Sequence, residues 1–160
     1  MAWELVETVT ASSSVASLTF SGIPTDGKML KIIANPQTNT NGVRLVIKVN
    51  GSTSGYNSKQ LYYTGDIGQS SGLSSQWEAG LMSGSRGSCG SLDVILPNYA
   101  NSEPKQFICK SFAAEGFGFA ADLMLAYGNW NNSSAITSIE LRPEVNVITT
   151  GATFSLYKFA

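Results

Sequence analysis

The sequence contains no histidine. Histidine is the commonest general base, the usual activator of Ser and Cys nucleophiles and a principal ligand of transition metals, so its absence removes most hydrolytic and metal-dependent chemistry. Eleven carboxylates remain, and a pair of acids is the arrangement that cleaves glycosides. No two acids in this chain are spaced as such a pair, because each fits a solvated strand face or a loop. We therefore predict a protein that is not an enzyme, with no catalytic residue, no cofactor and no metal site.

Charge is also scarce. Only 13% of the residues are charged, and ten basic against eleven acidic side chains leave a net charge of -1. Such a surface has little long-range field, so nothing in the composition favours nucleic acid or an anionic membrane as a partner. No apolar run approaches the roughly 20 residues that span a bilayer, and the first residues lack a basic segment followed by an apolar one. We expect a chain that is made in the cytoplasm and does not insert into a membrane.

The chain has two cysteines, Cys89 and Cys109. Without histidine, two thiols alone cannot supply the usual four ligands of a zinc site. We expect both to be small buried hydrophobic residues, with a disulfide between them as the alternative.

The residues that are present alternate with the period of β-strands. Residues 43–49 give the clearest pattern, since Val, Leu and Ile there alternate with Arg44 and Lys48, which places one face in the core and the other in water. Gly, Pro and Asn separate such runs. The runs occupy residues 3–10, 15–20, 29–35, 43–49, 91–97, 106–115, 120–130 and two stretches within 135–160.

These runs predict an all-β fold, an antiparallel β-sandwich of eight to ten strands in a single domain, residues 1–160. Several connections are longer than a hairpin loop, which favours a jelly-roll-like sandwich over a simple meander. We expect the first two strands to form a hairpin and the last two to form an antiparallel pair joined by a long loop. The apolar C-terminal strand should be central or well covered.

Residues at about 65–90 are rich in Gly and Ser but still carry large apolar side chains. A flexible linker does not need such side chains, so we interpret this stretch as an ordered excursion that packs against something, a neighbouring subunit being one option. Aromatic residues in expected loops have two readings: ring faces can stack on sugars, or the rings can anchor interfaces and core edges. The candidate interface or ligand-contact residues are Leu73, Trp77, Leu81, Met82, Tyr99 and Trp130.

Several segments carry a family resemblance. They are WELVETVT, SLTFSGIP, LKIIANP, LVIKVNGSTSGYNSKQLYYTG and, at the end, ITSIELRPEVNVITTGATFSLYKF. In this order they resemble small virion structural proteins of tailed bacteriophages. The resemblance covers both ends and most of the first half, whereas residues 70–130 match only in being Gly/Ser-rich with interspersed strands. Lys158 stands where Gly is common, and residues 43–48 are more apolar than usual.

The resemblance implies a β-sandwich on the outside of a virion, without catalytic residues. Such proteins occur as capsid decoration (cement) proteins, head fibres and tail-tip or tail-fibre components. We expect capsid decoration, because the chain shows no fibrous stalk or anchoring domain, with the major capsid protein as partner and trimers or dimers as the assembly. The alternative is a tail-fibre or tail-tip component that binds a host surface receptor or glycan.

Overall fold

The computed structural model describes residues 2–40, 42–63, 67–71, 75–84, 90–115 and 120–160. These residues form strands, turns and loops, with no helix among them, and hence none that is long and apolar enough to cross a membrane. The strands are β1 Trp3–Thr10, β2 Leu18–Ser21, β3 Met29–Asn35, β4 Val43–Val49, β5 Tyr56–Tyr63, β6 Ile67–Ser71, β7 Trp77–Met82, β8 Gly90–Pro97, β9 Lys105–Glu115, β10 Ala120–Trp130, β11 Ser138–Pro143 and β12 Thr153–Phe159.

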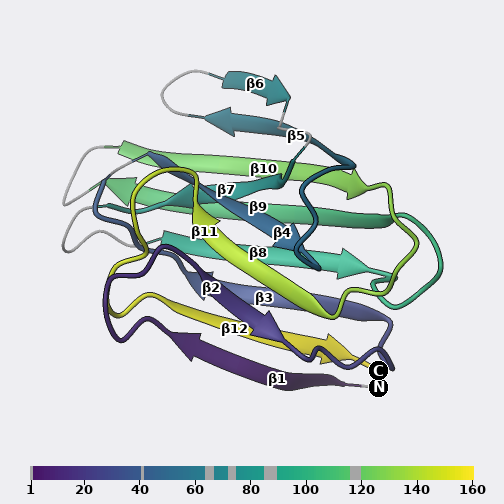
Figure 1. Cartoon of the computed structure of the whole chain (residues 1–160). Coiled ribbons are helices and arrows are strands. Elements are labelled where there is room, and N and C mark those ends of the chain that lie inside the picture. Colours follow the sequence, from purple (N-terminus) through teal and green to yellow (C-terminus); the bar gives the residue numbers. More distant parts are fainter. Residues whose placement is uncertain (1, 41, 64–66, 72–74, 85–89, 116–119) are drawn as a thin grey trace.

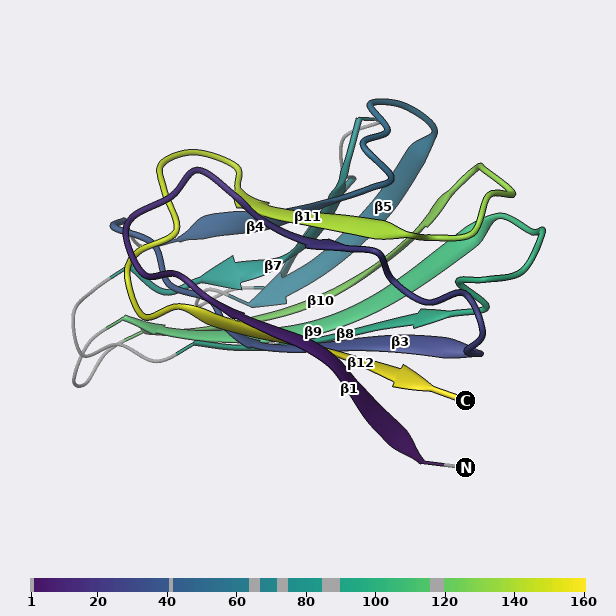
Figure 2. The same cartoon turned by 60° about the horizontal axis from the view of Figure 1, so that its bottom comes forward.

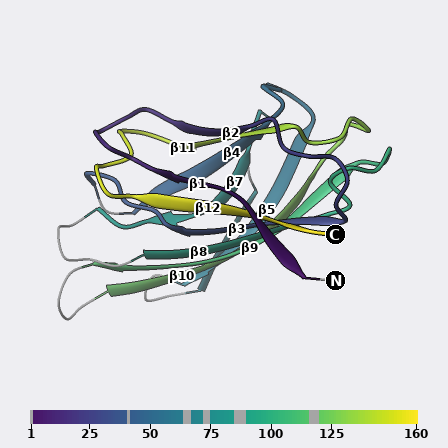
Figure 3. The ribbon, with the colours of Figure 1, turned by 90° about the horizontal axis from the view of Figure 1, so that it is seen from below.

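The strands form two antiparallel sheets (Figure 1). The larger sheet has the order β1-β12-β3-β8-β9-β10-β5-β6, and the smaller has the order β2-β11-β4-β7. Figures 2 and 3 show the sheets as two stacked layers, with β5 rising from the layer of the larger sheet toward β4 and β7. The fold is therefore the antiparallel β-sandwich that the alternation of residues predicts.

The strand order is that of a jelly roll. If the hairpins β5-β6 and β9-β10 are set aside, the remaining strands form two four-stranded sheets, β1-β12-β3-β8 and β2-β11-β4-β7, and successive strands wrap around the sandwich. Both hairpins are added at one side of the larger sheet, beyond β8. The described residues form twelve strands, more than the expected eight to ten, because residues 52–90 hold β5, β6 and β7, whose pattern is weak in the sequence.

The first two strands do not form the expected hairpin. β1 pairs with β12 in the larger sheet, whereas β2 pairs with β11 in the smaller one. The connection between β1 and β2 is held by backbone hydrogen bonds to the loop before β12: Ala11 N donates to Ala152 O at 2.9 Å and Val15 N donates to Ile148 O at 3.0 Å. The chain thus crosses from one sheet to the other, and both Ala11 and Ile148 are buried where it crosses.

The last two strands also lie in different sheets, so the expected pairing of β11 with β12 is wrong. The expectation of a covered C-terminus is confirmed, because β12 lies between β1 and β3, and its inward side chains Phe154 and Leu156 are fully buried. The Lys158 ammonium lies 2.9 Å from an Asp26 carboxylate oxygen and 3.6 Å from a Glu4 carboxylate oxygen. These ion pairs connect β12 to the loop before β3 and to β1.

β7 is the part of the Gly/Ser-rich excursion that enters the core. All six of its residues are buried. At Gly80 a Cβ atom would lie 2.5 Å from Leu92 Cδ1 and 2.9 Å from Ser111 Cβ, so only glycine allows the sheets to approach this closely. The adjacent Leu81 N–H donates to Ser111 Oγ across the sandwich at 3.0 Å. The excursion therefore packs against its own chain.

Candidate functional site

The outer face of the larger sheet carries an exposed apolar surface. Ten large hydrophobic side chains are exposed in the described residues, and nine of them lie on strands of this sheet. The smaller sheet contributes none to that set, and its outer face carries Ser21, Lys48 and Glu140 instead. The nine are Trp3, Leu5, Ile33, Leu61, Tyr63, Ile108, Leu123, Leu125 and Tyr127. We call these side chains, with the polar residues between them, the outer face.

Strand register brings these residues into rows across the sheet. Directly paired residues of antiparallel strands have side chains on the same face. One row is Leu61, Leu125, Lys110, Asp93, Ile33, Ser155 and Thr8. The next is Lys59, Tyr127, Ile108, Ile95, Lys31, Tyr157 and Leu5. The outer face is thus continuous from β5 to β1, although its residues come from distant parts of the chain.

A small apolar hollow of about 300 Å³ lies near the middle of the outer face. It is lined by residues of β3, β8, β9 and β10, including Ile33, Phe112 and Leu123. Beside it, the Lys31 ammonium lies 3.1 Å from an Asp93 carboxylate oxygen. An apolar depression next to an ion pair suits an apolar side chain of a protein partner, because the depression accepts the side chain and the charges fix its orientation.

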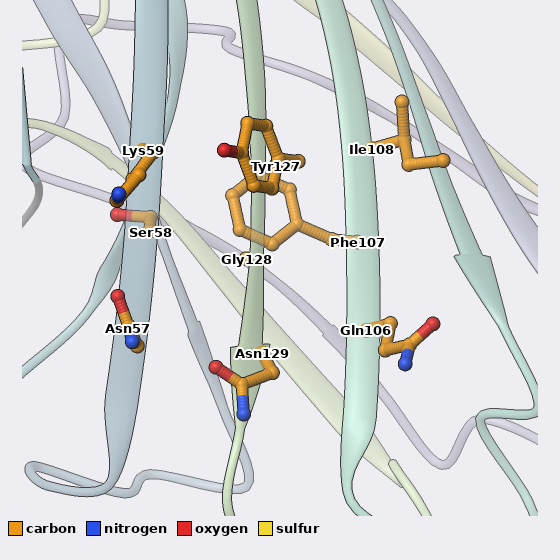
Figure 4. A pocket seen from close by; sticks show the side chains of 9 residues that line it. All are labelled: Asn57, Ser58, Lys59, Gln106, Phe107, Ile108, Tyr127, Gly128 and Asn129. Atoms are coloured by element: carbon orange, nitrogen blue, oxygen red, sulfur yellow. The ribbon is translucent and has the colours of Figure 1, made fainter.

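A second hollow, of about 640 Å³, lies on the same face where β5, β10 and β9 run together (Figure 4). Three amide side chains, of Asn57, Asn129 and Gln106, form one row across it. Lys59, Tyr127 and Ile108 form the adjoining row. This hollow therefore combines hydrogen-bonding groups with an aromatic ring, in contrast to the apolar hollow.

Gly128 forms the floor of the second hollow. A Cβ atom there would lie 2.1 Å from Asn57 O and 2.7 Å from Phe107 Cε1, which is impossible without moving the backbone of β5. The absence of a side chain allows the Phe107 ring to lie against the strand from the core side. The residue is thus required by packing beneath the hollow.

The structure places the residues singled out from the sequence in the core and not on a contact surface. Trp77, Met82 and Tyr99 are fully buried, and Trp130 and Leu81 are 3% and 7% exposed. These five side chains are therefore not exposed for contact with a partner or a sugar, and their burial supports the interpretation of the aromatic residues as core anchors. Leu73 lies outside the described residues. The aromatic residues anchor the fold because their rings fill the space between the sheets.

Trp77 is the centre of an aromatic cluster. Its ring meets that of Tyr56 edge to face, with centroids 5.5 Å apart, and lies 4.7 Å from that of Phe107. The Tyr56 ring stacks on Trp130 at 6.1 Å. Trp130 donates its indole N–H to Ser52 Oγ at 3.2 Å, whereas the Trp77 indole nitrogen has no hydrogen-bond partner among the residues that the structure describes. The cluster joins β5, β7, β9 and β10, and so fixes the strands that carry the second hollow.

Tyr99 closes the loop before β3. Its hydroxyl donates to Pro24 O and accepts a hydrogen bond from Gly27 N at 3.2 Å. Burial raises the pKa of this phenol, and the backbone hydrogen bond from Gly27 opposes that shift. The hydroxyl therefore satisfies the Gly27 N–H, which the fold has removed from water, and also binds the partly buried Pro24 carbonyl.

We expect the Tyr99→Phe variant to lose about 1–3 kcal/mol in the free energy of unfolding, because the buried Gly27 N–H loses its partner and the Pro24 carbonyl loses a donor. Urea denaturation measures this loss. Tyr127→Phe, which removes a half-exposed hydroxyl from β10, is the control and should change stability by less than about 0.5 kcal/mol. Equal stability of Tyr99→Phe and the wild type would contradict this role.

The residues of the outer face were missed because their strands are apolar on both faces. In β10, Leu123, Leu125 and Tyr127 alternate with Asp122 in the sequence, but they point outward, whereas Met124 and Ala126 point into the core. A two-layer sandwich needs only one apolar face per strand. A strand that is apolar on both faces is therefore the sequence feature that indicates an interaction surface on this sheet.

Cys109 is a free, fully buried thiol, as expected, and burial raises its pKa. Cys89 lies outside the described residues, so the expectation for it stays a prediction. Within the described ranges, no group of three or more Cys, Asp or Glu side chains is placed to hold a metal ion.

Comparison with known proteins adds no relative. No protein-family model matches the chain, and neither a curated protein nor a solved structure is detectably similar to it.

Proposed function

We propose that this chain is a non-enzymatic structural protein of a tailed-phage virion. In this proposal it decorates the outside of the capsid and holds neighbouring coat subunits through the outer face of its larger sheet. The partner is the major capsid protein, and the decorating unit is a trimer or a dimer. The segment resemblance supports the virion setting, and the outer face supports attachment to protein.

The observation that carries the proposal is the asymmetry of the sandwich. Both sheets cover the same core with their inner faces, but among the described residues nine large apolar side chains are exposed on the larger sheet and none on the smaller one. Contiguous exposed apolar surface of more than a few hundred Å² marks interaction sites on soluble proteins. A low density of charge is also typical of the core of an interface.

Attachment of this kind stabilises a shell by mass action, since a ligand that binds only the assembled shell lowers the free energy of that state. Particles that lack this protein are thus expected to break open at a lower temperature than complete ones. Adding the purified protein back should restore the original temperature. Equal resistance of the two kinds of particle to heat and osmotic shock would contradict a cementing role.

The site is tested with Leu125→Glu, which places a charge on the outer face between Leu61 of β5 and Lys110 of β9. We expect its affinity for the particles to fall by about tenfold or more, equivalent to about 1.4 kcal/mol. The matched control is Ser21→Glu, which adds the same charge to the outer face of the smaller sheet. Urea denaturation confirms that both variants are folded. Equal binding by both variants would rule out the outer face as the attachment site.

The second candidate function is that of a tail-fibre or tail-tip component that binds a host surface receptor. The hollow that contains Asn57, Asn129 and Gln106 favours it, because a row of amides serves recognition of a polar ligand better than adhesion to a coat. Purified protein that coats host cells and blocks infection would support this candidate over capsid decoration.

A further inference from the structure

We propose that the hollow between β5, β10 and β9 is a carbohydrate-binding site for a neutral oligosaccharide of at least two pyranose rings. This inference goes beyond the attachment of the protein to a particle and does not depend on it. The hollow belongs to the same outer face, so a sugar and a particle are expected to compete for one copy of the protein. It is carried by three features of the hollow, which are the amide row, the exposed tyrosine and the near absence of charge.

The amide row offers matched hydrogen-bonding groups. Asn57, Asn129 and Gln106 are directly paired across three neighbouring strands, so their side chains share one face. Within the described part of the chain, none of these three amides is engaged with another protein group. A side-chain amide both donates and accepts. A sugar hydroxyl does the same, so free amides in a row suit a run of hydroxyls.

The spacing of the row sets the length of the ligand. Neighbouring strands lie about 4.8 Å apart, so the three amides span roughly 10 Å across β5, β10 and β9. This distance is comparable with two linked pyranose rings. Because the three positions are fixed by regular strand pairing and not by a loop, the row is largely formed before a ligand arrives.

The aromatic ring supplies the second element. Tyr127 is 54% exposed and lies in the row next to the amides, above the Gly128 backbone (Figure 4). The C–H face of a pyranose is apolar and packs against an aromatic ring, while its hydroxyls remain available at the rim. Gly128 lies between Tyr127 and Asn129 and lets the Phe107 ring pack against the strand from the core side, which supports the backbone under the hollow.

The charge of the hollow selects the class of ligand. Lys59 is the single charged side chain among the residues that line it. One exposed lysine gives little affinity for a polyanion, and no carboxylate lines the hollow to hold a cation. The apolar hollow around Ile33 and Leu123, in contrast, has the two charged residues Asp93 and Lys110 in its lining and no side-chain amide. The two hollows therefore suit different partners, a neutral sugar and an apolar protein side chain.

The experiment is a screen of the purified full chain on an array of bacterial and eukaryotic oligosaccharides, followed by calorimetric titration with the strongest neutral ligand and with a uronic-acid oligosaccharide of the same length. We expect the neutral ligand to bind more tightly. Tyr127→Ala and Asn129→Ala should each lower its affinity by about tenfold or more. Leu123→Ala, on the same strand and face but outside this hollow, should change it by less than about twofold.

The inference is overturned if no oligosaccharide binds at millimolar concentration, if the uronic-acid oligosaccharide binds more tightly, or if Tyr127→Ala and Asn129→Ala bind the neutral ligand as the wild type does. Urea denaturation confirms that each variant is folded before titration. Attachment to particles is measured separately and without sugar. A negative result with sugars therefore leaves the capsid proposal standing, and a negative result with particles leaves the sugar site standing.

Discussion

Replacement of Trp77 by alanine should lower the free energy of unfolding by about 3–5 kcal/mol, the cost of removing a fully buried tryptophan from a packed core. The ring contacts Tyr56 and Phe107, which come from two other strands of the sandwich. Its loss leaves a cavity between the sheets that the strands cannot close, because they are held in register by their neighbours. Urea denaturation of the purified protein measures the change.

Two further variants separate the loss of the buried aromatic ring from the loss of the indole nitrogen and from the loss of an exposed ring. Trp77→Phe keeps an aromatic ring and removes an indole nitrogen that has no partner in the described part of the chain, so its loss of stability should be clearly smaller than that of Trp77→Ala. Trp3→Ala is the control, because that ring is 42% exposed and contacts only the edge of the larger sheet near Phe159. We expect it to cost no more than about 1.5 kcal/mol. If Trp77→Ala is as stable as the wild type but no longer attaches to particles, Trp77 is an interface residue and not a core residue.

Lys105→Met should cost about 2–4 kcal/mol, the second largest effect. Lys105 is fully buried at the start of β9, and its ammonium donates to Asn101 O at 2.5 Å, to Glu103 O and to Ser133 O at 3.4 Å. Burial lowers the pKa of this amine, and the Glu103 carboxylate opposes that shift. Methionine has a similar shape but no donor, so three carbonyls lose a shared partner.

The three carbonyls that Lys105 binds come from two loops. Asn101 and Glu103 lie between β8 and β9, and Ser133 lies between β10 and β11. Lys105 therefore fixes both loops at the end of the sandwich nearest the amide hollow, and its loss should loosen them together. The matched control is Lys110→Met on the same strand, where the side chain is exposed and a change within about 0.5 kcal/mol is expected. Hydrogen exchange of the amides in the two loops locates the effect. Unchanged hydrogen exchange and unchanged stability in Lys105→Met would contradict the proposed role of Lys105 in fixing these loops.

The sequence predicts well those parts of the fold that depend on local alternation. Residues 43–49 and 91–97 form strands as expected, with Leu45, Leu92 and Val94 inward, because one apolar face per strand fixes which side is buried. It does not predict which strands become neighbours. β1 and β2 follow each other but lie in different sheets, since in a jelly roll a connection crosses the sandwich as readily as it turns back.

The candidate site was harder to predict, for two physical reasons. Trp77 lies among Gly and Ser residues and therefore looks like a loop residue, but Gly80 is what allows its strand to pack deep between the sheets. The amide row combines Asn57, Asn129 and Gln106, which are far apart in the sequence and meet only through strand register. No local pattern carries such information.

The central claim is that the outer face of the eight-stranded sheet is the surface by which this protein attaches to a particle. The most direct measurement is lysine acetylation of the protein on intact virions and free in solution, read by mass spectrometry. Lys31 and Lys110 lie on the outer face, and Lys48 lies on the opposite sheet. We predict that attachment slows acetylation of Lys31 and Lys110 severalfold and leaves Lys48 unchanged. Protection of Lys48 with full reactivity at Lys31 and Lys110 would contradict the account.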